Sequence, residues 1–193
     1  MFKVFELYIQ SRFNFTDQEL SLIRSVTVSR KLKKKQYLLR MGDVCRHHTF
    51  VCAGCLRSYR IDESGTEHIL DFGTTNHWVT DEMSMFGSIP TVGYIDALED
   101  TDIIQISGNN FKNLIRDIPT FGLLYKKIAI EGMELGCDRI YSMISRKAED
   151  RYQDFKLRYP DLYHRLPLYM IASYLGVTRE TLTRIRASYN PMD

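Results

Sequence analysis

The stretch LYMIASYLGVTRETLTRIRA, residues 168–187, has the pattern of two short helices joined by a tight turn. Helices paired in this way cross steeply, so they need a small residue where they touch, and glycine is favoured in the turn. Ala172 and Gly176 occupy these two places. The positions that would face the domain core are apolar: Ile171, Leu175, Val177, Leu182 and Ile185. The segment therefore predicts a helix-turn-helix.

The second helix of the pair carries the side chains that would meet a partner. Thr178 stands where an N-cap residue accepts a hydrogen bond from the first exposed amides. The outward face is polar and charged: Arg179, Glu180, Thr183 and Arg184, with Arg186 towards the flank. In the major groove, arginine pairs with O6 and N7 of guanine, and glutamate accepts from N4 of cytosine. We therefore expect these six residues to contact double-stranded DNA. The alternative is a helix pair whose charges only face water.

Positive charge is concentrated in the same part of the chain. Residues 146–193 hold nine Lys/Arg residues against six Asp/Glu residues, a net charge of +3, whereas the whole chain carries only +2. The near-neutral total neither indicates nor excludes nucleic-acid binding, because binding depends on local patches. The total is thus an average over a basic C-terminal part and a more acidic remainder.

Upstream of the helix-turn-helix lies an apolar seam of helical spacing. Its residues are three, four, three and four positions apart: Ile130, Met133, Cys137, Ile140 and Ile144. This is the a/d pattern of a helix that packs along one face. The seam either lies on its own domain or joins two copies of the chain. The second alternative is favoured because the seam continues beyond the length that a small β-domain needs covered.

The region between residues 30 and 107 is made of short β-like runs separated by turn residues. The runs are Gln36–Arg40, Thr49–Ala53, Leu56–Ile61, Glu67–Phe72, Tyr94–Leu98 and Asp102–Ile106. Strands this short and regularly spaced are typical of a small roll, barrel or sandwich. Before them, residues 16–23 predict a helix with a capping box formed by Thr16 and Glu19. The basic residues between Arg30 and Lys35 are interpreted as a solvated face.

These patterns predict an α+β fold with three parts. We expect a β-roll over residues 1–116, a dimerisation helix over 117–146 and a helix-turn-helix domain over 147–193. The five residues after Ser188 are too few for a β-hairpin wing, and Tyr159–Pro167 leaves too little room for a hairpin before the helix pair. The helix-turn-helix domain is therefore expected to be nearly all helical and to lack a full β-hairpin wing.

Composition excludes several other classes of protein. The longest runs without a formal charge have thirteen residues, whereas a membrane-spanning helix needs about 20 apolar residues. Lys3 and Glu6 interrupt any signal-peptide core, so a cytoplasmic location is expected. No nucleophile with its base, P-loop or dinucleotide fingerprint is visible. We therefore expect no catalytic residues and no enzyme activity.

The four cysteines are Cys45, Cys52, Cys55 and Cys137. The two-residue spacing of Cys52 and Cys55 also occurs in zinc and iron–sulfur sites. A second such pair is absent, and the strand–glycine–strand junction would as readily bury one thiol and expose the other. Ordinary thiols and no metal are the expectation. Cys137 lies in the seam, where two copies in a dimer would approach each other.

The helix-turn-helix, and above all TRETLTRI at residues 178–185, resembles that of the Crp-Fnr family of bacterial transcription regulators, in variants of a Bacteroidetes-like kind. In that family the positions matching Arg179, Glu180 and Arg184 contact bases. The runs Leu39–Asp43, Phe50–Tyr59 and Gly65–Glu67 resemble the glycine-turned strands of the family's cyclic-nucleotide-binding β-roll. The seam helix is similar to its dimerisation helix, so the resemblance covers nearly the whole chain.

The phosphate cassette of that roll is where this sequence departs. The family has Gly-Glu, a short helix, then Arg and a small residue; its Glu holds the ribose hydroxyl and its Arg neutralises the cyclic phosphate. Here Glu82 is in place, Asp81 replaces the glycine and Thr91 falls near the arginine position. Moreover, no Lys or Arg occurs between Arg60 and Lys112. A phosphate would meet two carboxylates and no local cation, which opposes its binding.

The resemblance places an effector pocket around Glu82, Met83, Ser84, Thr91 and Val92. Because the phosphate-binding arginine is missing, cyclic nucleotide is not the expected ligand, and no other cofactor is indicated. The expected function is that of a homodimeric regulator that reads a palindromic operator. Double-stranded DNA and a second copy are its expected partners, with an unidentified small-molecule effector and RNA polymerase as further candidates and no membrane. The alternative is a small-molecule or redox sensor module whose DNA-reading head no longer works.

Overall fold

The computed structural model describes residues 1–189 and divides the chain into two compact units. The first unit comprises residues 1–61 and 70–129, and the second comprises residues 62–69 and those from 130 onward. The prediction that no wing follows the last helix falls on residues 190–193, which lie outside the described residues. The boundaries expected at 116/117 and 146/147 stay predictions.

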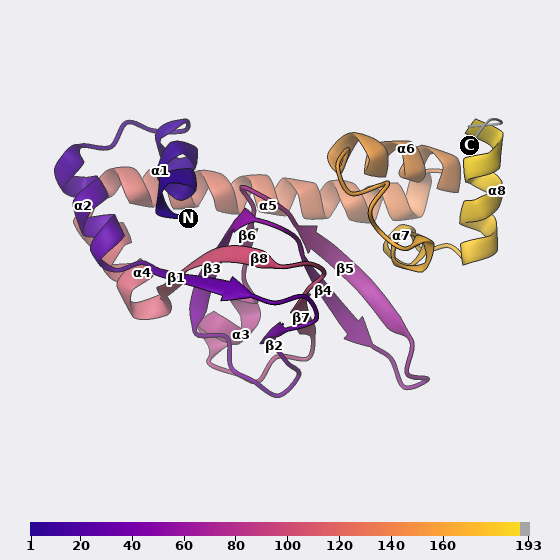
Figure 1. Cartoon of the computed structure of the whole chain (residues 1–193), viewed down its shortest axis with the longest axis horizontal. Coiled ribbons are helices and arrows are strands. Elements are labelled where there is room, and N and C mark those ends of the chain that lie inside the picture. Colours follow the sequence, from indigo (N-terminus) through magenta and orange to yellow (C-terminus); the bar gives the residue numbers. More distant parts are fainter. Residues whose placement is uncertain (190–193) are drawn as a thin grey trace. The chain divides into compact units, whose positions relative to one another are not determined.

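The first unit is built on two four-stranded antiparallel sheets, which Figure 1 shows facing each other as a roll. One sheet has the order β1-β8-β3-β6, formed by Val28–Leu32, Thr101–Ser107, His47–Ala53 and Trp78–Val79. The other has the order β2-β7-β4-β5, formed by Tyr37–Leu39, Tyr94–Ala97, Leu56–Ile61 and Glu67–Gly73. All six predicted runs are strands, with ends that differ by one or two residues.

The turn between β3 and β4 shows why these strands stop where they do. Gly54 has φ +98°, a conformation that residues with a side chain rarely adopt. A Cβ at this position would also lie 2.6 Å from Thr101 Oγ1. Only glycine lets the chain reverse this close to β8.

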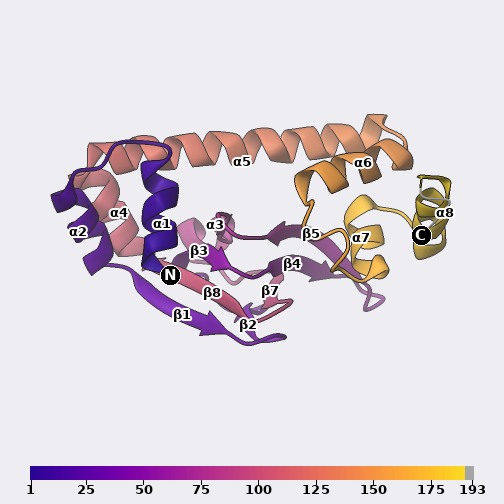
Figure 2. The same cartoon turned by 45° about the horizontal axis from the view of Figure 1, so that its top comes forward.

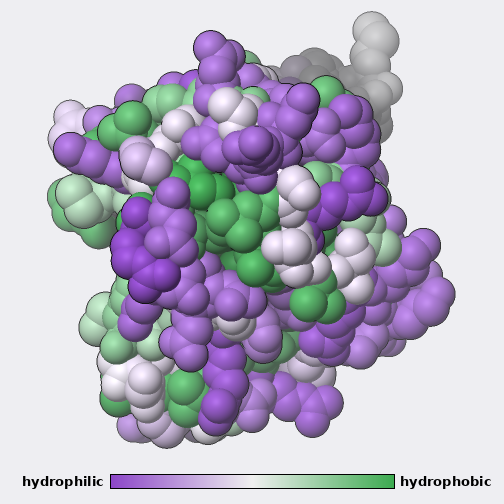
Figure 3. Space-filling model, turned by 90° about the vertical axis from the view of Figure 1, so that its left-hand side faces the viewer, coloured by the Kyte–Doolittle hydropathy of each residue, from purple (hydrophilic) through white to green (hydrophobic). Residues whose placement is uncertain are grey.

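Four helices complete the roll. They are α1 (Phe2–Gln10), α2 (Asp17–Ser25), α3 (Glu82–Gly87) and α4 (Gly108–Asp117). The predicted capping box is present in α2: the Thr16 N–H donates to Glu19 Oε2 at 2.8 Å, and Thr16 Oγ1 accepts from the Glu19 N–H. Figure 2 shows α1, α2 and α4 gathered at one end of the unit, and Figure 3 shows that end as a hydrophilic surface around an apolar area.

The core of the roll has two clusters separated by β3. Phe50 and Cys52 face the helices, together with Phe5 and Ile9 of α1, while Val51 faces the opposite sheet. Because β3 is buried on both faces, Cys52 is buried, and Cys55 just before β4 is buried as well, so the possibility that one thiol is buried and the other exposed does not hold. A register shift between Val51 and Ala53 adds to this loss of alternation.

Helix α5 (Pro119–Ser145) runs from the first unit into the second. Its start is anchored in the roll by Phe121 and Leu124, which are buried. The predicted seam lies further along, and its apolar side chains are exposed: Met133 by 71%, Ile140 by 63% and Ile144 by 81%. Within the described residues of the second unit, nothing covers these three side chains, and both alternatives for the seam stay predictions.

The second unit consists of the end of α5, the hairpin tip at residues 62–69 and three further helices. These are α6 (Ala148–Arg158), α7 (Leu168–Leu175) and α8 (Arg179–Tyr189). The core of the unit is aromatic and aliphatic: Tyr152, Phe155, Tyr159, Ile171, Leu182 and Ile185 are all buried. No helix among the described residues is both long and apolar enough to cross a lipid bilayer.

The basic residues between Arg30 and Lys35 are all exposed, as expected of a solvated face. Arg30 and Lys31 belong to β1, an edge strand that pairs with β8 and that the sequence did not predict. Four of the five residues of β1 are exposed, so its sequence shows no alternation. Charges on an edge strand discourage pairing with another chain.

Candidate DNA interface and effector cavity

The helix-turn-helix forms as predicted, and its turn is fixed by Gly176. This residue ends α7 in the left-handed conformation, with φ +65°. The Val177 N–H then donates to the Ala172 carbonyl at 3.0 Å, which closes the end of the helix. A Cβ on Gly176 would collide with Met143 Cε of α5. The turn therefore needs glycine for its backbone conformation, whereas the flexible end of the Met143 side chain could move aside.

Helix α8 begins with the predicted cap and presents the predicted face. Thr178 Oγ1 accepts from the Thr181 N–H at 3.2 Å. Leu182 and Ile185 are buried, whereas four of the six predicted contact residues are exposed and line one shallow hollow together with Ala187: Arg179, Glu180, Thr183 and Arg184. Thr178 is exposed at the start of the helix, and Arg186 is half-buried.

The charged end of α8 is preorganised by local hydrogen bonds. The backbone N–H of Glu180 and the Thr178 hydroxyl hold the pKa of Glu180 below its ordinary value, so this side chain is a carboxylate that can only accept. Thr183 Oγ1 donates to the Arg179 carbonyl at 2.9 Å. The surface thus offers arginine donors and one acidic acceptor at the N-terminal end of the helix.

The hairpin tip at residues 62–69 packs on α7 within the second unit. Ser173 Oγ donates to the Glu67 carbonyl and accepts from the Ile69 N–H, both at 2.9 Å. Arg139 of α5 donates to the carbonyls of Ile69 and Tyr174 at 3.2 and 3.1 Å. These bonds tie α5, α7 and the hairpin tip to one another.

A cavity of about 310 Å³ opens in the roll where the effector pocket is expected. Glu82, Met83 and Thr91 line it as predicted. Ser84 and Val92 do not: Ser84 Oγ lies behind the wall, donating to the Ile89 carbonyl at 2.7 Å, and the Val92 side chain is exposed elsewhere. Three of the five predicted residues are therefore brought together at the cavity.

The two departures from the phosphate cassette contact each other. Asp81 caps α3, accepting from the Ser84 N–H at 3.0 Å. Its other carboxylate oxygen accepts a short hydrogen bond from Thr91 Oγ1. The residue in place of the glycine and the residue near the arginine position thus satisfy each other, and a phosphate would have to displace this pair.

The prediction that the cavity lacks a cation is wrong. Arg60 of β4 lines the wall, although it lies far from the cassette in sequence. Three carboxylates line the same cavity: Asp71, Asp81 and Glu82. The cavity is therefore not devoid of positive charge, but carboxylates outnumber the arginine three to one.

Two residues of the lining each have a buried polar atom with no hydrogen-bond partner among the described residues: Trp78 Nε1 and Thr80 Oγ1. Buried donors left without a partner are costly and suggest a ligand or water that accepts from them. Sequence reasoning missed both, because β6 has only two residues and gives no periodicity. The alternation of side chains along β4 could have indicated Arg60, because it places Arg60 on the same face of the strand as Ser58, which also lines the cavity.

Glu82 also approaches a buried histidine. His48 Nδ1 lies 3.8 Å from Glu82 Oε1, and the imidazole stacks on Phe111 with ring centroids 3.7 Å apart. Burial lowers the pKa of His48 to about 4 and raises the pKa of Glu82, with Asp81 adding to the latter. His48 is therefore neutral at pH 7.

We expect the roll to lose about 2 kcal/mol of stability between pH 7 and pH 5 through His48. Below its unfolded pKa of about 6.5 the imidazole takes up a proton in the unfolded chain, whereas the folded pKa of about 4 prevents uptake in the native state. The urea unfolding of the roll, followed by the fluorescence of Trp78, gives this difference. In His48→Phe the loss should shrink by that amount; an unchanged pH dependence would show that His48 titrates normally.

The cysteines form no site in the described part of the chain. The Cys52 and Cys55 thiols donate to the carbonyls of Met1 and Leu56, and burial raises the pKa of Cys52 to about 11. No group of three or more potential metal ligands is present among the described residues. Cys137 is exposed on the seam.

Comparison with known proteins places the chain among regulatory proteins with a cyclic nucleotide-binding roll. A family model described as the cyclic nucleotide-binding domain matches residues 29–117, the roll without its first two helices. The regulatory protein HlyX of Actinobacillus pleuropneumoniae is 24% identical over 185 residues, which cover 90% of this chain and 76% of HlyX. The fumarate and nitrate reduction regulatory protein of Escherichia coli is also similar, at 23% identity over 185 residues, which cover 90% of this chain and 73% of that protein. The chain is thus similar to regulatory proteins along most of its length, and its roll is similar to the cyclic nucleotide-binding domain.

Solved structures show the same fold. FixK2 from Bradyrhizobium japonicum has a TM-score of 0.72 at 16% identity, covering 86% of this chain and 85% of that protein. A protein from Eubacterium rectale assigned to the crp/fnr family has a TM-score of 0.68 at 20% identity, covering 92% and 84%. The predicted α+β class, with a roll, a long helix and C-terminal helices, is confirmed.

Proposed function

We propose that this protein is a homodimeric regulator of the Crp-Fnr type that reads a palindromic operator through α8. The observation that carries the proposal is the exposed face of α8, where Arg179, Glu180 and Arg184 surround one hollow at the N-terminal end of the helix. A recognition helix inserts this end into the major groove. Since DNA is the proposed partner, its place of action is the bacterial cytoplasm.

The exposed seam of α5 supports the dimer. An apolar stripe on a 27-residue helix costs free energy while it faces water, and a second copy of the same stripe covers it symmetrically. A two-fold dimer presents two copies of α8 to successive turns of one face of the duplex. The operator is then a palindrome whose half-sites lie about 34 Å apart.

The effector proposed for the roll is a small polar molecule without a phosphate. Three carboxylates and one arginine line the cavity, and Asp81 and Thr91 already satisfy each other at the cassette. A neutral or cationic ligand fits this wall, because its carboxylates would repel an anion. Mass spectrometry of gently purified protein tests the proposal, and a copurifying cyclic nucleotide would contradict it.

We expect Arg184→Ala to weaken operator binding by about 1–3 kcal/mol and to relax specificity at one base position, with little change on random DNA. The physical reason is the loss of bidentate hydrogen bonds to a guanine edge. Gel shifts on operator variants and on random DNA measure both effects. Arg116→Ala, which removes an exposed arginine of α4 in the other unit, is the matched control and should bind as the unmodified protein does.

Two results would count against the proposal in different ways. Equal losses on operator and random DNA would make Arg184 a phosphate contact. No specific fragment in a gel shift against genomic DNA, or affinity independent of salt, would mean that α8 does not read DNA, since contacts to phosphates release counterions. That outcome would favour the alternative function, a small-molecule or redox sensor whose helix-turn-helix does not bind DNA.

A further inference from the structure

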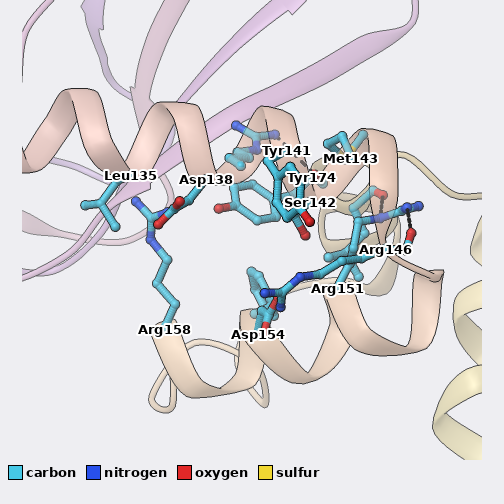
Figure 4. A pocket seen from close by; sticks show the side chains of 13 residues that line it. Leu135, Asp138, Tyr141, Ser142, Met143, Arg146, Arg151, Asp154, Arg158 and Tyr174 are labelled. Carbon is cyan, nitrogen blue, oxygen red and sulfur yellow. Dashed lines mark hydrogen bonds and ion pairs between the residues drawn. The ribbon is translucent and has the colours of Figure 1, made fainter.

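A second cavity, of about 370 Å³, lies entirely within the second unit. Its walls are the last turns of α5, the exposed edge of α6 and the end of α7, as Figure 4 shows from close by. Cavities of a few hundred cubic ångströms are the size that small organic ligands occupy. This one shares no residue with the effector cavity of the roll.

The cavity is on the side of α5 that the dimer seam leaves free. Successive residues of an α-helix are about 100° apart around its axis. Ser142, which lines the cavity, is therefore about 160° from Ile140 and from Ile144 of the seam. A second copy packed on the seam would leave the wall at Ser142 open, with Tyr141 at the edge between the seam and the cavity.

The charge of the lining is positive. Four arginines and two aspartates contribute to it: Arg139, Arg146, Arg151, Arg158, Asp138 and Asp154. One pair is neutralised within the wall, since Arg146 Nη1 lies 2.7 Å from Asp154 Oδ2. Figure 4 shows the guanidinium of Arg158 extending from α6 towards Asp138 of α5. The cavity retains an excess of two positive charges.

Arg151 has a hydrogen-bonding group left for a ligand. Its Nε donates to the Leu175 carbonyl at 3.1 Å and its Nη1 to the Arg146 carbonyl at 2.9 Å. No described residue accepts from its Nη2. A guanidinium held by two backbone carbonyls is fixed in place, so an incoming anion would not have to order it.

The remaining wall is aromatic. Tyr141, Phe155 and Tyr174 contribute rings, and the Arg139 guanidinium lies 4.1 Å from the centroid of the Tyr174 ring. A flat apolar body would fill the space between these rings, while an anionic group attached to it would meet Arg151 and Arg158. The chemistry of the lining thus specifies an aromatic carboxylate.

We propose that this cavity binds a small aromatic carboxylate and that its binding alters operator affinity. The cavity touches the elements that orient the recognition helix: Leu175 immediately precedes the turn at Gly176, and Met143 packs against that turn. A ligand that bridges α5, α6 and α7 favours one orientation of α8, and by linkage this changes the affinity for DNA. The regulatory half of the proposal rests on the proposed DNA-binding function.

The test uses the full chain and 2-naphthoate as the probe, with binding measured by calorimetry in the absence of DNA. We expect a dissociation constant below about 1 mM, and binding at least tenfold weaker for the uncharged analogue 2-naphthalenemethanol. Arg158→Gln, which removes a cation, and Ser142→Phe, which fills the cavity, should each weaken 2-naphthoate binding at least fivefold. Lys147→Gln, at the N-cap of α6, and Ser145→Phe, on α5, lie outside the lining and are the matched controls.

The outcomes separate the site from the function. The proposed site would be overturned if 2-naphthoate does not bind, if the alcohol binds equally well, or if Arg158→Gln binds 2-naphthoate unchanged. The Arg158→Gln variant keeps the test valid if Ser142→Phe does not fold. Saturating 2-naphthoate should change operator affinity at least threefold in gel shifts. If 2-naphthoate binds but does not change the operator affinity, regulation through this cavity is overturned. If the protein binds no operator at all, the proposed function is overturned and the proposed site is unaffected.

Discussion

The double substitution Met133→Glu/Ile140→Glu is expected to convert the protein to a monomer and to lower its affinity for a palindromic operator at least about 100-fold. Both side chains project from the seam, exposed by 71% and 63%. In the dimer they would be buried, each contributing about 1.5–3 kcal/mol. Glutamates at these positions would bring like charges together without partners, which costs more than the apolar contacts gain.

The loss of affinity follows from bivalent binding. A dimer that holds one half-site presents its second recognition helix at a high effective concentration, which adds a factor of about 10²–10⁴ over a single head. A monomer loses this factor but keeps its weak affinity for one half-site. Sedimentation or light scattering reports the oligomeric state, and gel shifts on full operators and half-sites report the affinity.

Leu157→Glu is the matched control for the seam variant. Leu157 is an apolar side chain of α6, 82% exposed and outside the seam, so a charge there should change neither mass nor affinity. If the double variant remains a dimer, the seam is not the interface. If it is a monomer that binds the full operator as tightly as the unmodified protein, the operator is not read by a symmetric pair.

The second large effect is expected from Asp96→Ala in the roll, which should lower the free energy of unfolding by about 3–5 kcal/mol. Asp96 of β7 and Arg57 of β4 are paired across the sheet and buried. Arg57 Nε donates to Asp96 Oδ1 at 2.9 Å and Nη2 to Oδ2 at 3.1 Å, while the Tyr59 hydroxyl donates to Oδ2 at 3.3 Å. Alanine would leave the guanidinium buried without its counterion.

Urea unfolding followed by Trp78 fluorescence measures this loss, because the single tryptophan lies in the roll. Asp117→Ala is the control: its pair with Arg116 is as short, at 2.7 Å, but both side chains are exposed, so the loss should not exceed about 1 kcal/mol. If the two variants lose similar free energies of unfolding, the burial of the Arg57–Asp96 pair does not add to its contribution to stability. Replacing both partners, in Arg57→Met/Asp96→Leu, should recover much of the loss.

Features that depend on neighbours in sequence were predictable. The helix-turn-helix, the cap at Thr178 and the capping box at Thr16 each involve residues within one or two helical turns. The effector cavity was predicted in part. Its residues on α3 and the following loop could be located by resemblance, whereas Arg60 and Trp78 arrive from other strands. No local pattern indicates which strands the fold brings together.

Two errors share a physical cause, namely the position of a strand in its sheet. β3 is central and covered on both faces, so Phe50, Val51 and Cys52 are all buried and the alternation expected of a half-buried strand is absent. β1 is at an edge, so its charged residues are exposed on both faces and look like a loop. Sequence alone gives the propensity of a strand but not its place in the sheet.

By itself, the sequence determined the parts whose energetics are local: the two short helices, the glycine with positive φ between them, the polar face of α8 and the apolar seam of α5. The tertiary structure decided which of these surfaces are open and which residues from distant elements share a cavity. It left the seam exposed and brought Asp81 into contact with Thr91. It also placed Arg60 in one cavity with three carboxylates, and four arginines in the lining of the other cavity. The reason is that burial and charge neutralisation depend on distances in space, and packing sets those distances only once the strands and helices have met.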